Sequence, residues 1–123
     1  MTIRSLPVGA LLLILGAPAG AGVKLAMHVS PAMAYEPATL AIRLSIEPDS
    51  NNRILLVVAD SGEFYRSSEI QLDGERAPRT NVIWYRSLPA GDYEVQGVLV
   101  GADGRTRAME RRALTVVGSG IRE

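Results

Sequence analysis

The sequence contains 123 residues with 13 basic and 13 acidic side chains, so its formal net charge is zero. A chain this close to neutrality has no electrostatic reason to bind nucleic acid or an anionic membrane surface. It also contains no cysteine, which excludes disulfide bonds and a catalytic Cys–His pair, so packing alone must hold the fold together.

The N-terminal segment, MTIRSLPVGALLLILGAPAGAG, is organised like a secretory signal peptide. Arg4 precedes an apolar stretch at residues 6–16, which is shorter than the roughly 20 residues that a membrane-spanning helix needs. Ala19-Gly20-Ala21 fits the pattern that a signal peptidase recognises, and residues 17–19 offer a second site. We therefore predict a signal peptide at residues 1–21 and an exported protein, periplasmic or extracellular. The alternative is an uncleaved membrane anchor.

The rest of the chain is predicted to form one domain over residues 22–118, with no membrane span, followed by a flexible tail at 119–123. Strict alternation of apolar and polar residues over residues 39–47 is typical of a half-buried strand. The apolar side chains of this strand are Leu40, Ile42, Leu44 and Ile46. A similar alternation over residues 23–29 predicts an earlier strand, which Ser30-Pro31 interrupts.

Five further strands follow. The run ILLVVA at residues 54–59 is apolar throughout, which indicates a strand covered on both faces or one whose outer face binds a ligand. The others are predicted at residues 64–72, 81–86, 93–99 and about 105–117, with a hairpin turn at Asp103-Gly104. Seven strands separated by turns predict an all-β, antiparallel two-sheet sandwich. The pattern does not show which face of residues 81–86 is buried.

The stretch LPAGDYEV at residues 88–95 resembles the turn into strand F of immunoglobulin-like and fibronectin type III-like domains. The matching residues are Leu88, Gly91, Tyr93 and Val95. The resemblance implies a tyrosine corner, in which the Tyr93 hydroxyl donates a hydrogen bond to backbone a few residues upstream. The chain lacks the cysteine pair of antibody domains, and its single tryptophan, Trp84, lies just before this turn.

Little in the sequence favours catalysis. A Ser–His–Asp triad would need His28, the single histidine, which alternates outward on the first strand. Asp60 and Glu63 lie close in sequence, but acid–base catalysis needs two carboxylates held in a cleft with separated pKa values. We therefore predict a protein that is not an enzyme and has no cofactor.

Metal binding has weak candidates in the segment MHVSPAM. Met27, His28 and Met33 offer the thioether and imidazole groups that copper prefers, in a chain that resembles small exported β-sandwich copper carriers in size and compartment. Met27 also alternates onto an apolar face, which indicates core packing, so we predict no metal site. Calcium at one end of the sandwich is weaker still, because the possible oxygen ligands lack a recognisable spacing: Asp49, Asn51 and Asp103.

A candidate binding surface lies in the strand after the apolar run. It consists of Phe64, Tyr65, Arg66, Ser67 and Ser68. Tyrosine and arginine are enriched at interfaces, and a sandwich strand needs only one face for the core. The alternative is that Phe64 and Ile70 fill the core.

The last strand is basic, with Arg105, Arg107, Arg111 and Arg112. These charges are interpreted as protection of a sheet edge against pairing, with binding of an acidic partner as the alternative.

Together, these features predict a non-catalytic module of the cell envelope that binds a protein partner of unknown identity or supports an assembly. A carbohydrate-binding module is the main alternative, although one Phe, one Trp and four Tyr leave few rings for stacking on sugars. A small periplasmic copper-binding protein is the third possibility.

Overall fold

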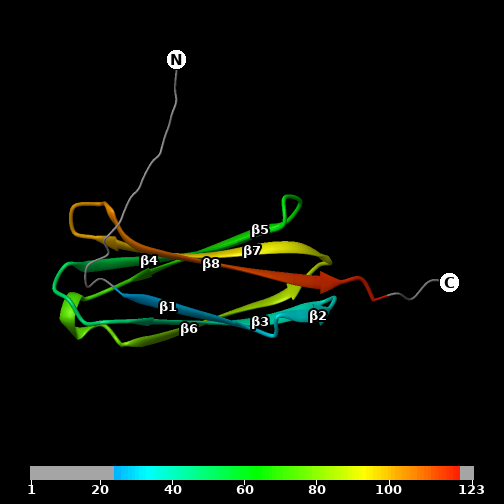
Figure 1. Cartoon of the computed structure of the whole chain (residues 1–123), viewed down its shortest axis with the longest axis horizontal. Coiled ribbons are helices and arrows are strands. Elements are labelled where there is room, and N and C mark those ends of the chain that lie inside the picture. The colour runs from blue at the N-terminus through cyan, green and yellow to red at the C-terminus, as the bar shows by residue number, and fades with distance from the viewer. Residues whose placement is uncertain (1–23, 120–123) are drawn as a thin grey trace, which may run out of the picture.

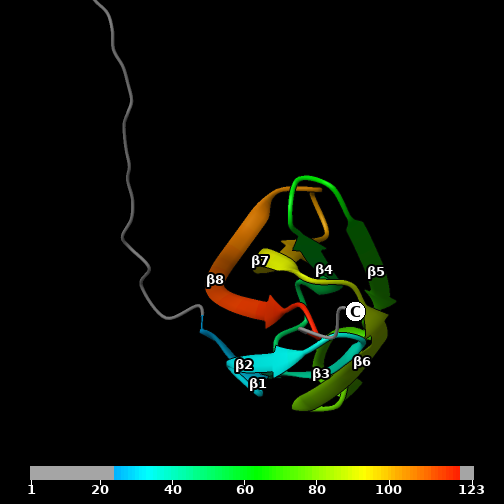
Figure 2. The ribbon, with the colours of Figure 1, turned by 90° about the vertical axis from the view of Figure 1, so that its right-hand side faces the viewer.

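The computed structural model describes residues 24–119, which form two β-sheets packed face to face (Figures 1 and 2). The predicted signal peptide and the end of the predicted tail lie outside the described residues. The strands are β1 (Leu25–Ser30), β2 (Met33–Tyr35), β3 (Ala38–Ile46), β4 (Asn52–Asp60), β5 (Tyr65–Gln71), β6 (Thr80–Leu88), β7 (Gly91–Gly101) and β8 (Thr106–Val117), with a short 3₁₀ helix, η2, at Gly74–Arg76.

One sheet has the strand order β1-β3-β6 and the other β2-β8-β7-β4-β5. All pairings are antiparallel except that of β2 with β8. The predicted all-β two-sheet sandwich is therefore confirmed. No helix among residues 24–119 is long and apolar enough to cross a membrane.

The sequence predicts seven of the eight strands and misses β2, because it places residues 31–37 between strands. After Ser30-Pro31 the chain leaves the first sheet, and Met33–Tyr35 pairs in parallel with Thr115–Val117 of the second. Tyr35 therefore lies on a strand, with 65% of its side chain exposed. Alternation over three residues gives no usable pattern, and the pairing partner lies far away in the sequence.

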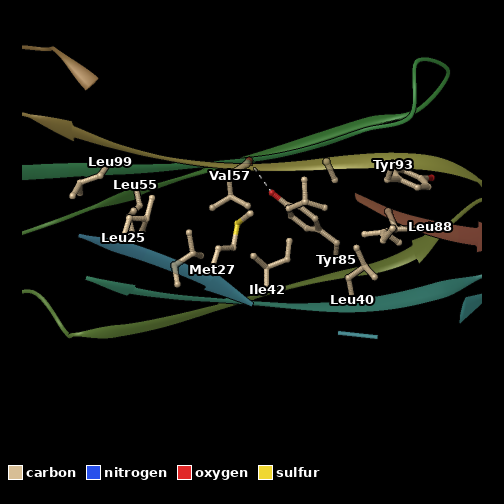
Figure 3. Close-up of a cluster of buried hydrophobic side chains, with 14 of the residues drawn as sticks. Leu25, Met27, Leu40, Ile42, Leu55, Val57, Tyr85, Leu88, Tyr93 and Leu99 are labelled. Carbon is tan, nitrogen blue, oxygen red and sulfur yellow. Dashed lines mark hydrogen bonds between the residues drawn. The ribbon is translucent and has the colours of Figure 1, made fainter. Parts of the chain in front are cut away.

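The core lies between the sheets and follows the predicted alternation of β3. Its inward side chains Leu40 and Ile42 are fully buried (Figure 3), and so is Leu44. In β4, Leu55 and Val57 face the core, whereas the side chains of the outer face are only half-buried. At about 25 cal/mol per Å² of apolar surface buried, such side chains supply the main stabilisation.

The structure shows which face of β6 is buried. Tyr85 points inward, and its hydroxyl donates to the carbonyl oxygen of Val57 at 3.1 Å (Figure 3). The same hydroxyl contacts Ser68 Oγ at 2.9 Å. Trp84 points outward and is 56% exposed. Burial raises the pKa of the Tyr85 phenol. The two hydrogen bonds explain why this tyrosine can lie between the sheets.

A β-bulge near the end of β6 leads into the turn before β7. Leu88 pairs with Ala38, whereas Tyr85 pairs with Leu40, so β6 has one extra residue between the two pairs. Ser87 adopts a φ of 62° at this position. Because of the extra residue, Leu88 and Tyr85 both face the core.

The turn contains the hydrogen bond of a tyrosine corner. Tyr93, near the start of β7, donates from its hydroxyl to the carbonyl oxygen of Pro89 at 2.7 Å. Its ring is buried and lies edge-on to Phe64, with centroids 6.4 Å apart. Burial also raises the pKa of Tyr93. Leu88 packs in the core beside this turn, and Gly91 begins the strand.

Candidate functional site

The loops at one end of the sandwich are held by a network of polar groups around Asn52. This side chain is fully buried. Its amide nitrogen donates to the carbonyl oxygen of Glu47 at 2.9 Å, and its amide oxygen accepts from Arg107 Nη1 at 2.6 Å. A buried amide with both ends paired fixes the turn between β3 and β4.

Arg107, which lies on β8, links that turn to the second sheet. Its side chain is only 16% exposed, and its guanidinium lies 3.4 Å from Asp49 Oδ2. The backbone N–H of Asn51 donates to Asp49 Oδ1 at 2.8 Å, and this hydrogen bond, with Arg107 nearby, lowers the pKa of Asp49. Ala102 N donates to Asn51 Oδ1 at 2.8 Å, so the β3–β4 turn and the β7–β8 hairpin are tied together.

The same turn forms one wall of a hollow. Arg53 Nη1 donates to the carbonyl oxygen of Ser50 and, at 3.1 Å, to that of Asn52. Opposite lies η2, where Gly74 is buried with a φ of +52°. A Cβ at Gly74 would lie 3.2 Å from Ser50 O and 3.5 Å from Arg53 Nη1. Glycine therefore allows η2 to approach the turn closely without strain.

The hollow measures about 370 Å³ and is open to solvent. It is lined by Ser50, Arg53, Leu72, Asp73, Gly74, Glu75 and Arg76. Within residues 24–119, the side chains of Asp73, Glu75 and Arg76 form no ion pair or hydrogen bond with another side chain. The sequence prediction treated residues 73–78 only as a loop and missed this site.

The predicted binding residues of β5 do not form a single surface. Tyr65, which is 63% exposed, and Ser67 lie on the outer face of the second sheet. Arg66 turns the other way, with its guanidinium 5.3 Å from the ring centre of Phe64 and 5.6 Å from that of Tyr85. Ser68 lies on the same face of β5 as Arg66 and contacts the Tyr85 hydroxyl.

Arg66 also joins the two sheets along this edge, because its Nη1 donates to the carbonyl oxygen of Arg86 at 3.0 Å. Phe64 is partly buried and packs against the core. Phe64, Arg66 and Ser68 therefore close the sandwich between β5 and β6.

The three copper candidates are likewise separated. Met27 is buried in the core, whereas His28 is exposed on the opposite face of β1. Met33 is exposed on β2, which belongs to the other sheet. No single site uses all three side chains.

The arginines of β8 and Arg105, which directly precedes it, have side-chain partners within the described chain, with the exception of Arg111. Arg105 lies 3.9 Å from Asp103 and Arg112 lies 2.9 Å from Glu110, while Arg107 joins the Asn52 network. Arg111 stands on the outer face, opposite Gln96. The predicted basic strand is therefore largely neutralised by neighbouring groups.

Residues 24–119 thus define an all-β protein of two packed sheets, with a charged hollow at one end. No protein-family model matches the chain, and no curated protein matches it in sequence.

Solved structures share its fold. A variant of the superoxide reductase (neelaredoxin) from Ignicoccus hospitalis aligns with a TM-score of 0.54 at 10% identity, over 85% of this chain and 87% of that one. The superoxide reductase of that organism gives 0.51 at 8% identity, over 79% and 82%. A family 76 glycoside hydrolase from a bovine Bacteroides thetaiotaomicron strain gives 0.54 at 16% identity, over 77% of this chain and only 20% of the hydrolase.

These comparisons contradict the function predicted from the sequence. They do not favour a non-catalytic envelope module for protein interaction or assembly, because most of the chain aligns with superoxide reductases, which are enzymes by name. The prediction is wrong because it took a sandwich pattern as a sign of an interaction module, whereas sandwiches host reactive and binding sites alike. At these identities the likeness shows the fold alone.

A metal centre would need a cluster of nitrogen, sulfur or oxygen ligands. Among residues 24–119, no group of three or more His, Asp or Glu side chains is placed to hold a metal ion, and the chain has no cysteine. The donor groups present do not fit such a centre, and we derive no chemistry from it.

Proposed function

We propose that this chain is an exported binding protein for a small charged solute, which it holds in the hollow between η2 and the β3–β4 turn. The observation that carries the proposal is a hollow of about 370 Å³ lined by four charged side chains. Three of them, Asp73, Glu75 and Arg76, have no side-chain partner within residues 24–119. Pockets that enclose drug-sized ligands measure about 300–1,000 Å³. The open hollow therefore has room for a smaller solute of a few heavy atoms.

The wall of the hollow that the β3–β4 turn forms is preorganised. Arg53 is fixed by two backbone carbonyl groups, and Leu72 N donates to Arg53 O at 2.8 Å. Beneath the turn, the buried Asn52 and Arg107 hold the backbone in place. A wall that is rigid before binding lowers the entropy cost of fixing a ligand.

The proposal includes two features that the sequence predicts. The tyrosine corner and the two-sheet strand order support membership of the immunoglobulin-like class of sandwiches. In immunoglobulin variable domains, loops at one end of the sandwich carry the binding residues. Export rests on the N-terminal sequence, residues 1–21.

The test is a two-dimensional NMR titration of ¹⁵N-labelled protein with small carboxylates, small amines and free amino acids. We expect saturable shift changes confined to residues 50–53 and 72–77. Arg76→Ala should abolish or weaken them, because its guanidinium lines the hollow. The matched control is Arg79→Ala, which removes the same charge from an exposed position of the same loop that does not line the hollow.

Two results would overturn the proposal. One is the lack of any saturable change with all three classes of solute. The other is stoichiometric binding of a divalent transition metal ion in place of the solutes, which would show that the likeness to superoxide reductases extends to metal chemistry.

A further inference from the structure

The charges that line the hollow balance each other. Arg53 and Arg76 contribute two positive groups, and Asp73 and Glu75 contribute two negative groups. In the described part of the chain, no distance of 4.0 Å or less joins a cation of this set to an anion of the set. The hollow therefore keeps opposite charges apart instead of pairing them internally.

A ligand of a single sign would satisfy only half of these groups. An anion would be attracted by the two guanidinium groups but repelled by the two carboxylates. A cation would be attracted by the carboxylates but repelled by the guanidinium groups. A ligand that carries both signs complements both halves, and like-charge contacts of this kind are what exclude wrong ligands.

The two arginines are not equivalent. Arg53 uses Nη1 for backbone carbonyl groups, which leaves its other nitrogens for a ligand, whereas the guanidinium of Arg76 has no partner within residues 24–119. A planar guanidinium suits a carboxylate, to which it donates two parallel hydrogen bonds. Glu75 and Asp73 supply acceptors for an ammonium group, because neither side chain is engaged, Asp73 not even as a helix cap.

From this arrangement, and resting on the function proposed above, we infer that the ligand is a small zwitterion of the α-amino acid type. Arg76 binds its carboxylate and Glu75 binds its ammonium group. Gly74 precedes both residues in η2 and lines the same hollow.

The experiment uses three related probes: alanine; propionate, which lacks the ammonium group; and ethylamine, which lacks the carboxylate. Dissociation constants come from NMR titrations of the full chain. We expect alanine to bind at least tenfold more tightly than either of the others. Glu75→Gln should reduce the preference for alanine over propionate by about tenfold, and Arg76→Ala should do the same for alanine over ethylamine.

The controls distinguish solute binding in the hollow from the preference for a zwitterion. Glu63→Gln removes a carboxylate from the exposed turn between β4 and β5, which does not line the hollow, and should leave every affinity unchanged. Equal affinities for alanine and propionate, or for alanine and ethylamine, would overturn the zwitterion and leave solute binding intact. Failure of all three probes to bind would overturn both. Denaturation curves for each variant show whether a lost affinity reflects lost folding.

Discussion

Removal of the Tyr93 hydroxyl offers the sharpest test of what holds the two sheets together. In Tyr93→Phe the ring stays in the core, edge-on to Phe64, and only the 2.7 Å hydrogen bond to the Pro89 carbonyl oxygen is lost. An acceptor that loses its partner in a buried position costs about 1–3 kcal/mol. Pro89 is half-buried, so water reaches it in part, and we expect a loss of about 1–2 kcal/mol.

The free energy of unfolding is measured by urea denaturation of the purified protein. The matched control is Tyr35→Phe, because this hydroxyl is on an exposed side chain, and its loss should change stability by no more than about 0.5 kcal/mol. For a domain of this size, about 1–2 kcal/mol corresponds to a melting temperature lower by roughly 5–15 °C. Equal stability of the two variants would refute a structural role for the corner.

Three further predictions concern acid stability, core packing and processing. The pKa of Asp49 is lowered by the Asn51 N–H and by Arg107, so the stability contributed by this carboxylate is present above pH 3.8 and is lost as the pH falls through the lowered pKa. In Asp49→Asn, the denaturation midpoint should therefore fall less steeply below pH 3.8 than in the wild type. An unchanged slope would refute this role. Gly97→Ala would place a Cβ 2.8 Å from Leu44 Cδ2, and the resulting overpacking should cost about 1–2 kcal/mol in the same urea assay; wild-type stability would show that the core adapts freely. Mass spectrometry of protein from its native host should find an N-terminus created by cleavage after residue 21, or after residue 19 at the second site, whereas a soluble cytoplasmic form that retains its first residue would contradict export.

The sequence predicts the fold well because local alternation and turn chemistry both point to the same architecture. Leu40, Ile42 and Leu44 alternate in the sequence and are buried together in the structure. The turn residues before Tyr93 likewise predict a hydrogen bond that the structure contains. In each case, the information lies within a few neighbouring residues.

The parts that the sequence does not predict depend on partners distant in the chain. The parallel pairing of β2 needs β8, and the inward direction of Tyr85 depends on acceptors in β4 and β5. Asn52 gives no sign of burial, because an asparagine after Asp-Ser-Asn is typical of an exposed turn. Its burial requires Arg107, 55 residues away.

The candidate site is also a feature that depends on residues distant in the chain. Arg53 and Glu75 line one hollow only because Gly74 lets η2 approach the β3–β4 turn. The corner around Tyr93 lies at the opposite end of β6, which begins after η2 and ends at Leu88. Energetic effects of residues this far apart and without shared partners usually add independently. A substitution in the hollow that lowers affinity at unchanged stability therefore reports on the ligand, whereas one at the corner reports on the packing of the sheets.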